Sequence, residues 1–89
     1  MINKLENTID CEFGTGDICV TGGSFEESGR KLGVVTMSNQ APREIGAEGD
    51  IKAGANYKLG DFPVILTFTK KESIDVVIRA LENAKQDMD

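Results

Sequence analysis

The chain has 89 residues and a formal net charge of -5, from 15 acidic and 10 basic side chains. This length predicts a single domain, residues 1–89, with a small core. The acidity disfavours binding to a nucleic-acid duplex, because an acidic body repels the phosphate backbone. Hydrophobic residues make up 39% of the sequence, which is typical of a globular domain rather than a disordered one. Homo-oligomerisation, which would add buried surface, is left open.

The N-terminal part alternates apolar and polar residues and predicts a hairpin. Segment 7–13 (NTIDCEF) is a strand, GTGD is a turn, and ICVT is a second strand. If Phe13 pairs with Ile18, then Cys11 and Cys19 lie on opposite faces of the sheet. Two cysteines on opposite faces indicate reduced thiols and therefore a cytoplasmic protein.

The stretch VTGGSFEESGRK, residues 20–31, is glycine-rich and is interpreted as a loop before a third strand over 33–38. It is not a P-loop, because Arg30 and Lys31 occupy the positions where that motif has lysine and serine or threonine. Phe25 is expected to pack inward. The Arg30–Lys31 pair could still bind an anion without any motif.

Residues 39–61 hold four glycines and a proline and predict a long loop that contains one or two short strands. Two of its residues are candidate binding residues. Arg43, in an acidic surrounding, could anchor an interface, and the alternative is an ordinary solvent loop. Tyr57 could stack on a base, and the alternative is that it fills a gap in the core.

The C-terminal part predicts a strand followed by a helix. The run FPVILTF, residues 62–68, is apolar and β-branched, as in a strand. An apolar stripe of helical period predicts an amphipathic helix over 70–86, with Thr69 and Glu72 as its capping box. Lys70 and Lys71 lie in the first turn, where the helix dipole disfavours cations and attracts anions.

Together these elements predict an α+β fold. A curled, mostly antiparallel sheet of four or five strands occupies residues 7–68, and the C-terminal helix over 70–86 packs on it. No segment has the length and apolar character of a membrane span, and the polar start does not resemble a leader peptide.

The sequence predicts a non-enzymatic protein without a metal or cofactor. It has no histidine, the commonest general base, and two cysteines without zinc-site spacing. The acidic residues of the loops lack EF-hand spacing, and whether they bind a cation is left open. These residues are Glu26, Glu27, Glu48 and Asp50.

In its size, acidity, β-rich body and ending ESIDVVIRALENAK, the chain resembles small proteins encoded by tailed phages and prophages. Some of these are counter-defence factors, so the resemblance implies a partner from the host's immune machinery. The first hypothesis is sequestration of a phosphate-bearing, nucleotide-like small molecule. The alternative is an acidic, anti-CRISPR-like inhibitor or adaptor that covers a basic surface of a host defence protein. The candidate ligand-binding residues are Arg30, Lys31, Lys70, Lys71, Arg43 and Tyr57.

Overall fold

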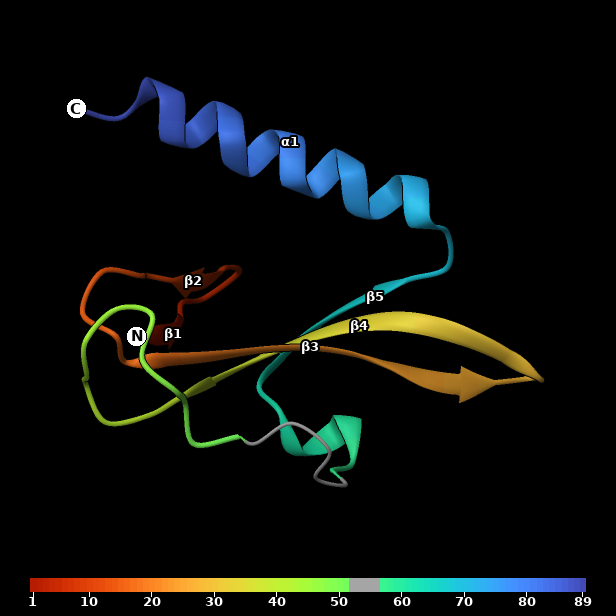
Figure 1. Cartoon of the computed structure of the whole chain (residues 1–89). Helices are drawn as coiled ribbons and strands as arrows, with labels where there is room; N and C mark the ends of the chain where they lie inside the picture. The colour runs from red at the N-terminus through yellow and green to blue at the C-terminus, as the bar shows by residue number, and fades with distance from the viewer. Residues whose placement is uncertain (52–56) are drawn as a thin grey trace. The chain divides into compact units, whose positions relative to one another are not determined.

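The computed structural model describes residues 1–51 and 57–89. Within them it has five strands, a 3-10 helix and one α-helix (Figure 1). The strands form two antiparallel sheets, β1-β2 and β3-β4-β5, so the α+β class is confirmed, with the strands in two sheets instead of one. In chain order the elements are β1 (Ile2–Lys4), β2 (Ile9–Cys11), β3 (Ile18–Glu27), β4 (Arg30–Asn39), the 3-10 helix (Leu59–Asp61), β5 (Val64–Phe68) and α1 (Lys71–Asp87).

The chain divides into two compact units, and β3, β4 and β5 each contribute to both. Unit 1 comprises Met1–Gly22 and Val35–Leu66, and unit 2 comprises Gly23–Val34 and Thr67–Asp89. The organisation of residues 1–89 as a single domain stays a prediction.

The predicted loop over residues 20–31 is wrong, because β3 continues through the glycines and meets β4 in a tight hairpin. The connection is Ser28–Gly29, with φ angles of 52° and 77°. Positive φ at both central residues is the geometry of the two-residue type I′ turn, which suits the twist of paired strands. β3 is an edge strand, and a Cβ atom at Gly22 or Gly23 would meet nothing within 4 Å. Glycines are therefore tolerated there, since no neighbour requires a side chain to pack against.

The core is small, as the chain length predicts. Alternate residues of β4 are buried, among them Leu32 and Val34 in unit 2, as expected for a strand with one covered face. In unit 1 the buried hydrophobic residues are Ile18 and Cys19. Phe25 is half-buried.

The predicted pairing of Phe13 with Ile18 is wrong. β2 pairs with β1 instead, in a register that places Cys11 opposite Ile2. Between β2 and β3, the chain turns so that Asp17 Oδ1 accepts a hydrogen bond from the N-terminal ammonium nitrogen, at 2.9 Å, and forms an ion pair with it. Both cysteines are free thiols, Cys11 half-buried and Cys19 buried.

The N-cap of helix α1 lies one residue later than predicted, so the Thr69–Glu72 capping box is not formed. Its N-cap is Lys70, at φ -138° and ψ 140°, and no side chain caps the first turn. The apolar stripe is only partly covered: Ile74 is half-buried, whereas Leu81 is 65% exposed. The described residues contain no helix that is both long and apolar enough to cross a membrane.

Candidate anion-binding site

A cleft of about 190 Å³ lies in unit 2, where β4, the end of β5 and the start of α1 meet. Three lysines line it: Lys31 from β4, and Lys70 and Lys71 from the start of the helix. The other lining residues include the apolar Phe68 and Ile74. The full set is completed by Ser24, Leu32, Gly33 and Thr69.

Strand alternation explains why Lys31 is available to this cleft. Because Leu32 is buried on one face of β4, Lys31 and Gly33 belong to the other face. A Cβ atom at Gly33 would lie 3.5 Å from Cδ1 of Ile74, so the early part of α1 lies against this face. The helix therefore brings its basic start to the strand that carries Lys31.

A hydrogen bond ties the two basic segments together. Arg30 donates from Nη2 to the carbonyl oxygen of Thr69 at 3.1 Å, across 39 residues of sequence. All four cations of this region, Arg30, Lys31, Lys70 and Lys71, are exposed. Of the two ion pairs in residues 1–51 and 57–89, neither involves any of them. The four cations are therefore available to pair with an anion.

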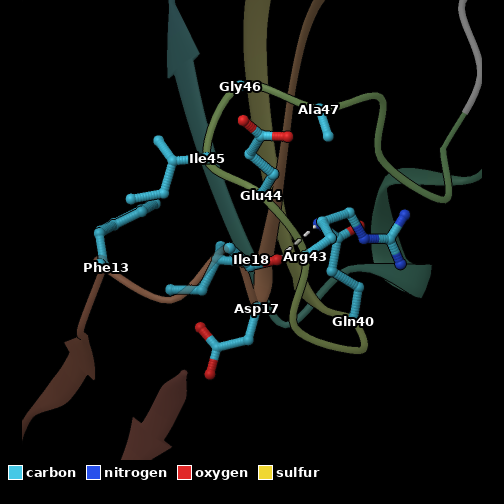
Figure 2. Close-up of a pocket in the computed structure, with 11 residues that line it drawn as sticks. Phe13, Asp17, Ile18, Gln40, Arg43, Glu44, Ile45, Gly46 and Ala47 are labelled. Carbon is cyan, nitrogen blue, oxygen red and sulfur yellow. Dashed lines mark hydrogen bonds between the residues drawn. The ribbon is translucent and has the colours of Figure 1, made fainter.

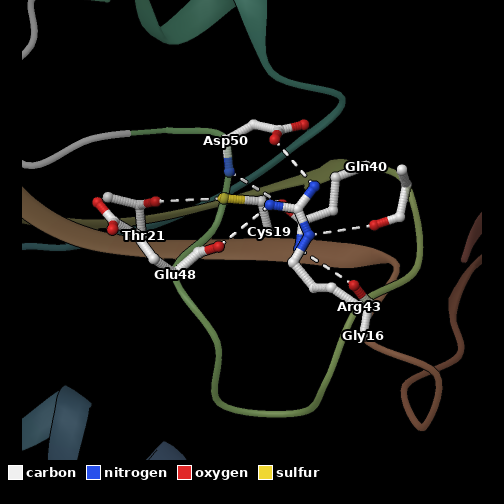
Figure 3. A network of polar contacts seen from close by, with 8 residues as sticks. Gly16, Cys19, Thr21, Gln40, Arg43, Glu48 and Asp50 are labelled. Atoms are coloured by element: carbon white, nitrogen blue, oxygen red, sulfur yellow. Dashed lines mark hydrogen bonds and ion pairs between the residues drawn. The ribbon is translucent and has the colours of Figure 1, made fainter.

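The other two candidates, Arg43 and Tyr57, lie in unit 1 and do not line this cleft. Arg43 is engaged with its own loop: it donates to the carbonyl oxygens of Ala41 and Glu48 and pairs with Asp50 at 2.9 Å (Figure 3). Its role there is to brace a loop. Tyr57 is 47% exposed and packs edge-to-face on an aromatic neighbour, with ring centroids 5.8 Å apart.

Four carboxylates were candidate cation ligands in the sequence, and among the described residues they do not form a metal site. Asp50 is used by Arg43, and Glu48 interacts with Arg43 only through its backbone oxygen. Glu26 and Glu27 lie at the exposed end of β3. In the part of the chain that the structure describes, no three histidine, cysteine, aspartate or glutamate side chains come together as a metal site would require.

Sequence reasoning missed a second hollow, of about 270 Å³, in unit 1 (Figure 2). It lies between the segment 13–18 and the loop 40–47. Phe13, the last residue of the predicted strand 7–13, lines this hollow and is 55% exposed. The available signal was Ile45, an isolated large apolar residue between a glutamate and a glycine.

Comparison of the chain with protein-family models, curated proteins and solved structures gives no match. The function is therefore inferred from the geometry of the two hollows.

Proposed function

We propose that this protein is a non-enzymatic, cytoplasmic binding protein that holds the phosphate group of a small nucleotide-like molecule in the unit 2 cleft. The observation that supports this most strongly is the convergence of Lys31, Lys70 and Lys71, from two distant segments, on one hollow, with no ion-pair partner among the described residues. Sequestration of a nucleotide immune signal is the cellular role that the resemblance to phage counter-defence proteins implies.

The first turn of α1 is electrostatically more favourable with an anion bound beside Lys70 and Lys71 than with the two lysines alone. A cation in the first turn opposes the helix dipole at a cost of about 0.3–1 kcal/mol. Lys70 and Lys71 both lie in this position, and no side chain caps the free N–H groups. A bound phosphate reverses this conflict, because it pairs with the lysines and also accepts hydrogen bonds from those N–H groups.

The size of the cleft limits what it can enclose. Pockets for drug-sized ligands usually measure about 300–1,000 Å³. At about 190 Å³, this cleft is smaller. The cleft is therefore suited to the phosphate end of a ligand. An apolar part of the ligand next to the phosphate would pack against Phe68 and Ile74, and the rest of the ligand would lie outside the cleft.

Isothermal titration calorimetry tests the proposal. The titrants are inorganic phosphate, AMP, a cyclic mononucleotide and a cyclic dinucleotide, at low ionic strength because exposed charges are screened by salt. Lys31→Gln, Lys70→Gln and Lys71→Gln should each raise the Kd about two- to fivefold, since one exposed charge contact contributes up to about 1 kcal/mol. Lys85→Gln is the matched control: it removes the same charge in the last turn of α1, outside the cleft.

Two results would contradict the proposal. If Lys85→Gln weakens binding as much as the cleft variants do, the ligand responds only to overall charge. If no titrant produces heat, the cleft does not bind phosphate. The alternative would then gain weight, namely an acidic inhibitor or adaptor that contacts a host protein.

A further inference from the structure

The unit 1 hollow is a groove in which two large apolar side chains, Phe13 and Ile45, remain accessible. Phe13 and Ile45 lie beside each other at one end of it, and Ile18 lies next to them (Figure 2). Ile45 is 73% exposed, the largest exposed fraction among the large hydrophobic side chains that line the groove. Large apolar side chains gathered at an exposed groove are typical of a site that binds another molecule.

The loop that presents Ile45 is held in place by its polar contacts (Figure 3). Arg43 bridges the two ends of the loop through Ala41, Glu48 and Asp50. Gln40 donates to the carbonyl oxygen of Gly16 at 3.1 Å and accepts from the Asp50 N–H at 3.0 Å. A loop that is ordered before binding loses little conformational entropy when a partner arrives.

The charges around the groove are acidic once the internal pairs are set aside. Asp17 is neutralised by the N-terminal ammonium group, and Arg43 by Asp50. Within residues 1–51 and 57–89, this leaves Glu44 as a carboxylate of the lining that joins no ion pair. Next to the lining in sequence stand Glu12, before Phe13, and Glu48, after Ala47; both are exposed, and neither joins an ion pair among the described residues.

We propose that this groove binds a basic peptide segment of a partner protein. An apolar side chain of that segment enters beside Phe13 and Ile45, and flanking lysine or arginine side chains pair with the carboxylates, foremost Glu44. A second copy of this chain is a poor occupant by comparison, because two bodies of charge -5 repel each other. The groove shares no residue with the unit 2 cleft, so the inference does not rest on nucleotide binding.

Fluorescence anisotropy with the labelled peptide Gly-Lys-Arg-Leu-Lys-Arg-Gly tests the proposal. The parent protein should bind it, and binding should fall at least about tenfold when the leucine is replaced by glycine or when the basic residues are replaced by glutamate. Ile45→Ser and Glu44→Lys should each weaken binding about tenfold. Ile65→Ser and Glu6→Lys are matched controls at exposed positions outside the groove and should bind within about twofold of the parent.

Circular dichroism of every variant shows whether it is folded, so a loss of binding can be assigned to the groove. The inference is overturned if the parent does not bind the peptide, or if the leucine and glycine peptides bind equally, which would mean that only charge is recognised. It is also overturned if sedimentation velocity shows a self-association that Ile45→Ser abolishes. In that case the occupant is a second copy.

Discussion

The start of helix α1 offers a sharp test of the balance between stability and ligand binding. Lys70 has the extended backbone of an N-cap residue, but its ammonium group is only a donor and cannot accept an N–H of the first turn. Serine is among the preferred N-cap residues because its hydroxyl oxygen accepts an N–H of the first turn. We therefore predict that Lys70→Ser stabilises the free protein and weakens phosphate binding.

The magnitude follows from two contributions. A serine cap stabilises a helix by about 0.5–2 kcal/mol relative to a residue that cannot cap. Removing a cation from the first turn adds about 0.3–1 kcal/mol. The Ser73 N–H already donates to the carbonyl oxygen of residue 70 at 3.1 Å, so the new hydroxyl mainly serves the Glu72 N–H. We expect a net gain of about 1–2 kcal/mol.

Urea denaturation followed by circular dichroism at 222 nm measures this gain, since α1 is the one α-helix in the described part of the chain. With a slope of about 1 kcal/mol per molar urea, the midpoint should rise by about 1–2 M. Lys85→Ser is the control: it removes a cation from the last turn, where the helix dipole favours one, and should lower the midpoint slightly. An unchanged or lower midpoint for Lys70→Ser would refute the argument.

Three further predictions concern single positions. Gly16→Ala should destabilise the protein by at least about 2 kcal/mol, because φ is +71° there and the added Cβ would lie 1.8 Å from the Arg43 carbonyl oxygen; Gly22→Ala, in open space, is the urea-denaturation control, and equal midpoints would contradict this reasoning. Gly33→Ala should raise stability by about 0.4–1 kcal/mol, since its Cβ would make ordinary contacts and the unfolded chain loses freedom; a loss of stability in the same assay would show that α1 does not lie against β4 as described. Hydrogen bonding from the N-terminal ammonium lowers the pKa of Asp17, so its stabilising contribution is present above the ordinary aspartate pKa and is lost as the pH falls through the lowered value. Asp17→Asn should therefore destabilise the protein at neutral pH and differ least from the parent in strong acid; a difference independent of pH in urea titrations would argue against this ion pair.

Local periodicity in the sequence was enough to predict several elements. The apolar stripe located α1 to within a residue at each end, and the β-branched run before it located β5. The two basic pairs at residues 30–31 and 70–71 were also visible in the sequence as departures from an acidic background. Each of these features depends on a residue and its near neighbours, which is the information that a single sequence carries best.

Non-local hydrogen bonds decided the remainder. The glycines of β3 belong to a strand because β4 pairs with them through a Ser28–Gly29 turn, and serine at positive φ gives no turn signal as strong as Asn-Gly. The groove beside Ile45 depends on Gln40, which ties its loop to the distant carbonyl oxygen of Gly16, while Arg43 braces the loop from within.

The sequence by itself determined the helix, the strand-rich body and the identity of the candidate cations. Only the tertiary structure decided that Lys31 shares a cleft with Lys70 and Lys71, whereas Arg43 serves its own loop. The physical reason is that the spacing of residues along the sequence sets which face of a helix or strand each side chain occupies. Which faces meet depends on contacts between distant segments, such as the Arg30–Thr69 hydrogen bond.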